Sequence, residues 1–103
     1  MRNAAVIGGL LLKRSAMRYA PAGTPIVEFV IAHSSLQDEA RSRRKVQCDV
    51  DAVAVGELAV RVDGLKLNQR LQVTGFLARN SMGIRNLVLH AAKIETAGDA
   101  DSD

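Results

Sequence analysis

The chain has 103 residues, of which 48% are hydrophobic and 24% are charged. This length falls within the span of one domain and excludes an enzyme with separate substrate and cofactor domains, while the composition excludes a disordered chain. No apolar run approaches the roughly 20 residues that span a bilayer, and residues 1–12 lack the features of a signal peptide, so we expect a cytosolic protein without a membrane partner.

The cysteine and histidine content argues against a disulfide or a metal site. Cys48 is the only cysteine, and with the distant His33 and His90 it does not make a structural zinc set. No nucleophile motif or acid-base pair is evident either. We therefore expect no metal, no cofactor, no small-molecule substrate and no catalysis. We interpret Cys48 as a small core residue and both histidines as hydrogen-bonded residues at the edge of the fold.

Charge is unevenly distributed along the chain. The formal net charge is +3, but three of the eleven acidic residues lie in the last five positions, so residues 1–98 carry all 14 basic residues against eight acidic ones. A basic surface attracts polyanions, although surface cations also serve solubility. The acidic end is interpreted as a solvated terminus, with competition against DNA for the basic face as the alternative.

The dominant hydrophobic period is two, which predicts strands. The first spans Ala4–Leu12, where Gly8-Gly9 suits a bulge or a sharp bend, as a strand shared between two parts of a barrel requires. The second covers Ile26–Ala32, is apolar on both faces and follows Thr24-Pro25. The third is Lys45–Ala52, whose even-numbered residues face the core.

A short helix and two more strands complete the pattern. Gly56–Gly64 has the apolar spacing of a helix. Strands follow at Leu71–Leu77 and, after a turn, at Leu87–Ile94. Two polar segments, Ser34–Arg44 and Asn80–Gly83, fall outside the regular pattern and are predicted to be loops.

The predicted order is strand, strand, strand, short helix, strand, strand. This order is typical of the OB-fold, with an SH3-like closure as the alternative. We therefore predict an all-β protein, a five-stranded OB-fold Greek-key barrel with one short helix between strands 3 and 4. We expect residues 1–96 to form the domain and residues 97–103 to form a flexible acidic C-terminal tail.

Sequence features spread over residues 3–96 resemble one bacterial family. They are Asn3 with the strand after it and Gly9, Pro21-Ala-Gly-Thr-Pro25 before a hydrophobic strand ending at His33, Ser35-Leu-Gln-Asp-Glu-Ala40, Gln47-Cys48, Gly75-Phe76, Leu87-Val-Leu-His90 and Ile94-Glu95. Each occurs widely by itself. In this order and spacing they resemble primosomal replication protein N (PriB), a relative of the single-stranded-DNA-binding proteins.

The resemblance implies an OB-fold homodimer in the bacterial cytoplasm that binds single-stranded DNA. It further implies a role in replication restart, in which the protein bridges the primosomal helicase and a helicase-loading partner. Where members of this family are expected to carry aromatic residues near positions 42 and 47, this chain has Ser42 and Gln47. We therefore expect binding that is weaker and more salt-dependent than in an aromatic-rich relative.

The residues also predict a DNA surface directly. Single-strand binding needs cations that follow the backbone and flat side chains that stack on bases. Cations cluster in three segments that an OB-fold would bring beside its second and third strands. The predicted single-stranded-DNA site consists of Lys13, Arg14, Arg18, Arg43, Arg44, Lys45, Gln47, Arg79 and Arg85.

Aromatic residues are scarce, and two aspartates oppose the site. Phe29 alternates with core residues and is predicted to be buried, while Tyr19, beside a turn, either stacks on a base or packs on the surface. Arginine planes can replace some stacking. Asp49 and Asp51 on the outer face would repel phosphates unless they lie outside the DNA path or at a dimer contact.

Two further expectations concern partners. An uncharged strand from Asn3 to Leu12 would be an exposed apolar edge unless covered, which favours a twofold dimer. The alternative function is a protein-interaction adaptor on the same fold, with weak or no DNA binding, whose basic face binds an acidic protein segment. Because a fold does not specify function, salt-sensitive binding that prefers single strands is needed to distinguish the two.

Overall fold

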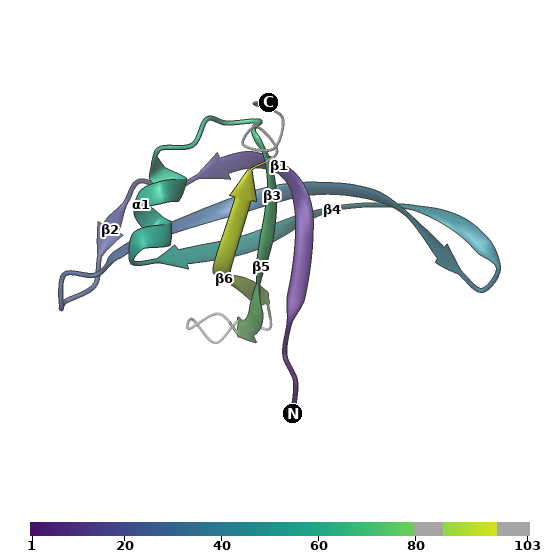
Figure 1. Ribbon diagram of the computed structural model, residues 1–103, viewed down its shortest axis with the longest axis horizontal. Helices are drawn as coiled ribbons and strands as arrows, with labels where there is room; N and C mark the ends of the chain where they lie inside the picture. The colour runs from purple at the N-terminus through teal and green to yellow at the C-terminus, as the bar shows by residue number, and fades with distance from the viewer. Residues whose placement is uncertain (80–85, 97–103) are drawn as a thin grey trace.

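The computed structural model describes residues 1–79 and 86–96. Its elements are β1 (Ala5–Arg14), β2 (Arg18–Tyr19), β3 (Pro25–Glu39), β4 (Ser42–Val55), α1 (Glu57–Asp63), β5 (Arg70–Arg79) and β6 (Leu87–Thr96) (Figure 1). The predicted loop at Asn80–Gly83 and the predicted acidic tail lie outside the described residues. Within the described ranges, no helix is long and apolar enough to cross a membrane.

Five of the strands form a closed barrel. The sheet order is β1-β5-β6-β4-β3-β2, and a second pairing between β1 and β3 closes the sheet on itself. The strands pair antiparallel except for β4 with β6, and α1 connects β4 to β5. The predicted five-stranded OB-fold with one short helix between strands 3 and 4 is confirmed. The two-residue β2, which pairs with β3, was not predicted.

The barrel closes because β1 changes its partner along its length. Its first part, Ala5–Leu10, pairs with β5, and its last part, Leu10–Arg14, pairs with β3. This confirms the predicted shared strand. The irregularity in the ladder, however, lies between Leu11 and Lys13 rather than at Gly8-Gly9.

Gly9 has a different role, which is to let two strands approach closely. A β-carbon at this position would overlap the carbonyl oxygen of Ala32 and contact Cγ2 of Ile31 at 2.7 Å. Only a residue without a side chain therefore lets β1 pass this close to β3.

The hairpin of β3 and β4 extends well beyond the barrel (Figure 1). The two strands remain paired as far as Glu39 and Ser42, so the prediction of a loop over Ser34–Arg44 is wrong. The chain reverses at Ala40-Arg41, where both residues have positive φ angles of 49° and 67°. Positive φ at both central residues is the pattern of a type I′ turn, which Asn-Gly usually marks. We call residues 34–47 the hairpin arm.

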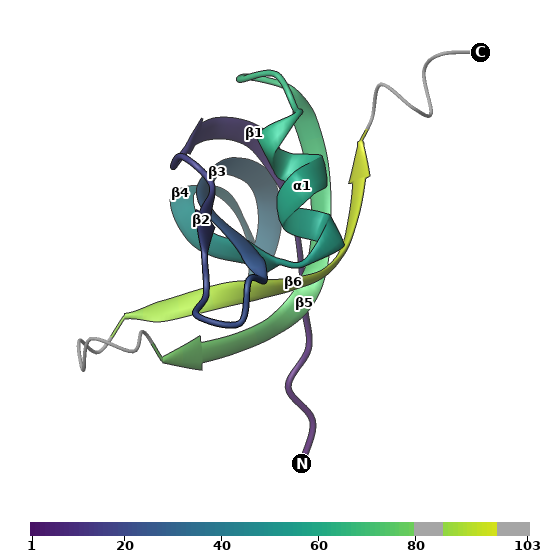
Figure 2. The same cartoon turned by 90° about the vertical axis from the view of Figure 1, so that its left-hand side faces the viewer.

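The core lies inside the barrel, and α1 packs against β3, β4 and β6 at the end that also holds β2 (Figure 2). Its buried hydrophobic residues are Leu11, Val27, Phe29, Ile31, Ala52, Ala54, Ala59, Val62, Leu71, Val73, Leu89 and Ile94. Phe29 is 2% exposed, as predicted. The helix begins after Gly56, ends before Gly64 and buries Ala59 and Val62, which confirms the predicted helix.

Cys48 is exposed, so its interpretation as a core residue is wrong. It lies on the same face of β4 as the buried Ala52 and Ala54. Position 48 lies next to the hairpin arm, however, and β6 pairs with β4 only at Ala52 and Val53. The alternation of residues predicts the face of a strand but not the point at which the barrel stops covering it.

Gly9→Ala is expected to lower the free energy of unfolding by roughly 1–3 kcal/mol, the usual cost of overpacking. Gly8→Ala is the matched control on the same strand, because its β-carbon would lie 3.7 Å from the nearest atom, the carbonyl oxygen of Leu71. Urea denaturation followed by circular dichroism measures both variants. Equal stability of the two would contradict the close approach at Gly9.

Candidate nucleic-acid interface

The outer faces of β3 and β4 form the floor of the candidate site. Because Phe29 is buried, its neighbours Glu28 and Val30 point away from the core. The strand register places Glu28 opposite Val53 and Val30 opposite Asp51. The floor is therefore a mixture of apolar and acidic side chains.

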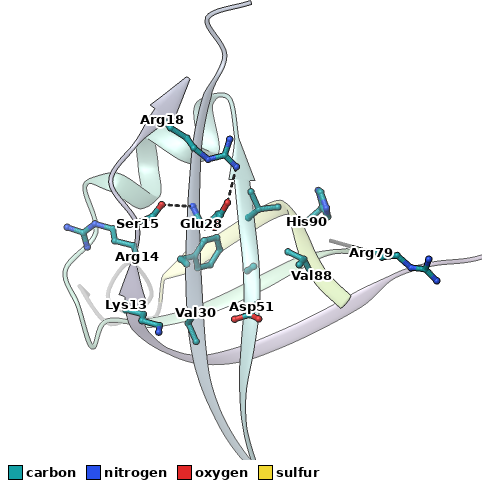
Figure 3. Close-up of a pocket in the computed structure, with 13 residues that line it drawn as sticks. Lys13, Arg14, Ser15, Arg18, Glu28, Val30, Asp51, Arg79, Val88 and His90 are labelled. Atoms are coloured by element: carbon teal, nitrogen blue, oxygen red, sulfur yellow. Dashed lines mark hydrogen bonds and ion pairs between the residues drawn. The ribbon is translucent and has the colours of Figure 1, made fainter. Parts of the chain in front are cut away.

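A groove of about 550 Å³ lies over this floor (Figure 3). Residues from all six strands contribute to it, so segments distant in sequence meet there. Its lining consists of Lys13, Arg14, Ser15, Arg18, Glu28, Phe29, Val30, Asp51, Ala52, Val53, Arg79, Val88 and His90. We call this site the groove.

Three exposed cations surround the groove. Lys13 lies beside Val30, its cross-strand neighbour, and Arg79 is the last residue of β5. Arg18 forms an ion pair with Glu28, with 2.9 Å between Nη2 and Oε1 and with side chains 58% and 60% exposed. An exposed pair of this kind is worth at most about 1 kcal/mol. The guanidinium of Arg18 can therefore exchange Glu28 for a phosphate at little cost.

Arg14 lines the groove, but its charged guanidinium is hydrogen-bonded to another part of the chain. Its Nη1 donates a hydrogen bond of 2.6 Å to the carbonyl oxygen of Leu65, and its guanidinium points away from Val30 and Asp51 (Figure 3). The next residue, Ser15, donates its backbone N–H to the carbonyl oxygen of Glu28, and its hydroxyl accepts from the N–H of Glu28. These hydrogen bonds fix the rim of the groove. Arg14 therefore supplies no free cation to the groove.

Two carboxylates lower the positive potential of the groove. Glu28 is paired with Arg18, and Asp51 is exposed on the outer face, as predicted. Within the described residues, no ion pair involves Asp51. The lining holds four cations and two carboxylates, so the groove attracts phosphates only moderately.

A second set of cations lies on the hairpin arm. Arg43 pairs with Asp38 at 3.6 Å, and Arg44 pairs with Glu39 at 3.2 Å, all with highly exposed side chains. The alternation along β4 puts Arg43 on the same face as Asp51 and Arg44 on the opposite face. Lys45 also shares the face of Asp51. The arm thus extends the outer face of the barrel with additional cations.

The structure brings together only part of the predicted site. Lys13, Arg14, Arg18 and Arg79 line the groove, while Arg43, Arg44 and Lys45 lie along the arm. Gln47 lines a second groove, of about 850 Å³, where the arm meets β1, β5 and β6. Arg85 lies outside the described residues. The sequence predicts one surface on which these cations converge. In the structure the described cations lie in two places, the groove and the hairpin arm.

One aromatic feature of this face was missed from the sequence. The rings of Phe76 and His90 stack with their centroids 5.0 Å apart and their planes 10° from parallel, and His90 lines the groove. The sequence contained a signal for this exposed ring. Phe76 lies between Gly75 and Leu77, so the alternation of β5 places it on the outward face of the strand, together with polar residues. Tyr19, on β2, is 66% exposed.

The remaining histidine is hydrogen-bonded, as predicted. His33 Nδ1 lies 2.6 Å from the carbonyl oxygen of Gly8, and its Nε2 lies 2.8 Å from the hydroxyl oxygen of Ser35. These contacts hold the base of the arm on β1. In the part of the chain that the structure describes, no three histidine, cysteine or acidic side chains are grouped as metal ligands.

A family model, "Another single-strand binding protein family", matches residues 3–93. The chain belongs to this family. Among its relatives, Replication restart protein PriB of Nitrosomonas europaea is 34% identical over 89 residues, which cover 86% of this chain and 82% of the relative. PriB of Photorhabdus laumondii is 34% identical over 102 residues, which cover 96% and 97% of the two chains. The resemblance to PriB is confirmed.

Solved structures agree with this placement. PriB from Ralstonia solanacearum superposes with a TM-score of 0.86 at 32% identity, covering 93% of this chain and 98% of that chain. The single-stranded DNA binding protein of Thermus aquaticus has a TM-score of 0.74 at 24% identity, covering 92% of this chain and 50% of that one. The second likeness supports the OB-fold alone.

Lys13→Ala and Arg79→Ala are each expected to weaken binding to single-stranded DNA. If each cation contacts one phosphate, each loss reduces the slope of log affinity against log salt by about 0.7. Lys66→Ala, an exposed cation outside the groove, is the control and should leave the slope unchanged. Fluorescence anisotropy at several salt concentrations measures all three variants. Equal slopes in the wild type and both groove variants would place the DNA elsewhere.

Proposed function

We propose that this protein binds single-stranded DNA and acts as an accessory protein of replication restart in the bacterial cytoplasm. The observation that carries the proposal is the groove, in which cations from β1, β2 and β5 meet over the outer faces of β3 and β4. OB-folds bind oligonucleotides on the corresponding strands. The PriB relatives, named as replication restart proteins, support the biological role.

The lining of the groove favours a single strand over a duplex. Val30, Val53 and Val88 offer apolar surface between the cations. Bases of a single strand can contact such a surface, whereas in a duplex they are paired and stacked inside the helix. The cations at the rim would follow the sugar-phosphate backbone, and the sequence of bases would matter little.

Binding of moderate strength is proposed, for two reasons. Glu28 and Asp51 line the groove and would oppose phosphates there, and the arm carries Ser42 and Gln47 where aromatic residues are expected in the family. Most of the affinity would then come from counterion release, which falls steeply as salt rises.

A homodimer is part of the proposal, and its support is the free edge of β1. From Ala5 to Gly9 this strand pairs with β5 on one side, and β3 joins it only from Leu10 onward. Val6 in this stretch is 58% exposed. Pairing with the same strand of a second copy would cover an apolar edge that otherwise favours aggregation.

We further propose that the protein bridges the primosomal helicase and a helicase-loading partner. A second candidate function follows from this, a protein-interaction adaptor with weak or no DNA binding. The two carboxylates in the groove favour it because they oppose phosphates, while the cations around the groove would remain available to an acidic segment of a protein partner.

Titration of labelled oligo-dT of about 15 to 30 nucleotides, at low and high salt and with a matched duplex as control, tests the main proposal. Saturable binding that prefers the single strand and weakens with salt is expected. No binding at low salt would contradict DNA binding and leave the adaptor. Sedimentation equilibrium of the same protein should give twice 11.1 kDa if β1 forms the dimer, and a monomer mass at micromolar concentration would contradict it.

A further inference from the structure

The Phe76 and His90 pair is an unusual feature of the outer face. The two residues lie directly opposite each other on β5 and β6, and their rings stack in the offset geometry that aromatic pairs prefer. Phe76 nevertheless remains 45% exposed and is not part of the hydrophobic core cluster. The pair therefore presents an aromatic surface to solvent instead of filling the barrel.

The backbone beside the pair is shaped to hold it. At Gly75 a β-carbon would overlap the carbonyl oxygen of His90, so the glycine lets β5 approach β6 closely. The ladder between the strands is also irregular between Thr74 and Gly75. Both features act next to Phe76 and fix its position opposite His90.

The strand register connects this pair to the groove. His90 lies between Phe76 on β5 and Val53 on β4, and Val53 lies opposite Glu28 on β3. The four side chains form one row across four adjacent strands, about 14 Å long at the usual strand spacing of about 4.8 Å. Phe76 is at one end of this row, and Arg18, paired with Glu28, is at the other.

Phe76 is linked to the groove more directly than the other aromatic residues. Phe29 is buried. Tyr19 and Phe76 both lie outside the groove lining, but Phe76 stacks on His90, which is part of that lining. Arg79, a groove cation, lies three residues further along β5, about 10 Å from Phe76 at the usual rise of a strand. An aromatic ring, a groove and a nearby cation are the parts that single-strand binding combines.

We propose that Phe76, supported by His90, is a base-stacking platform for single-stranded nucleic acid, with Arg79 contacting the adjacent phosphate. This inference rests on the proposed DNA-binding function and assigns its stacking site. The platform supplies the flat surface that Ser42 and Gln47 do not. Because every base has a π-face, it binds bases with little regard to sequence.

The first test compares Phe76→Leu with Tyr19→Leu, which removes the other exposed ring and is the matched control. Binding of oligo-dT and of an abasic oligonucleotide of the same length is measured by anisotropy, and circular dichroism checks that both variants are folded. Phe76→Leu should bind oligo-dT at least about fivefold more weakly, the equivalent of roughly 1 kcal/mol for one stacked base. Its affinity for the abasic strand and its salt slope should equal those of the wild type, and Tyr19→Leu should bind both strands normally.

Three results would overturn the platform in different ways. If the wild type binds oligo-dT and Phe76→Leu binds it equally well, the platform is wrong and the proposed function stands. If the wild type does not bind single strands at all, both are wrong. A loss in Tyr19→Leu without a loss in Phe76→Leu would move stacking to β2 and also overturn the proposal.

A second variant keeps the test valid if Phe76→Leu does not fold. The chain contains no tryptophan, so Phe76→Trp retains an aromatic ring and introduces a single tryptophan as the fluorescent reporter. Saturating oligo-dT should quench its emission, and an abasic strand should not. Tyr19→Trp is the control and should not be quenched. Unchanged emission of Trp at position 76 in the bound state would overturn the platform.

Discussion

The close passage of β1 across β3 is the constraint on which the rest of the structure depends. β1 has to leave β5 and join β3 within a few residues, and the absence of a side chain at Gly9 allows this. Without this crossing the sheet would remain open, and Leu11 could not fill the barrel. The hydrophobic core and the curved outer face both follow from closure, because a closed barrel forces alternate residues of every strand into a single interior.

The candidate site is a consequence of that closure. A curved sheet brings β1, β2, β5 and β6 around the outer faces of β3 and β4, so Lys13, Arg18 and Arg79 lie around one groove although they are far apart in sequence. The groove is not strongly basic, since Glu28 and Asp51 lie inside it. Under the proposed function, apolar and aromatic surface must then contribute to binding, and Phe76 with His90 offers such a surface beside the groove.

The barrel could be predicted from the sequence because its strands alternate between apolar and polar residues and its helix lies between two glycines. The hairpin arm could not, since both of its faces are polar and its turn, Ala40-Arg41, lacks the glycine that marks most such turns. The burial of Cys48 was predicted wrongly for a related reason, because the alternation of apolar and polar residues does not show where the barrel ends. Charge patterning indicated the cations, but it could not show that the guanidinium of Arg14, which lines the groove, is hydrogen-bonded to the carbonyl oxygen of Leu65.

The central claim is that the outer face between Lys13 and His90 binds single-stranded DNA. Chemical-shift mapping of the isotope-labelled protein during titration with oligo-dT tests it most directly, because each backbone amide reports separately. The account predicts the largest shifts at Lys13, Val30, Val53 and His90, with small shifts on α1. Shifts concentrated on α1, with the groove amides unchanged, would contradict it.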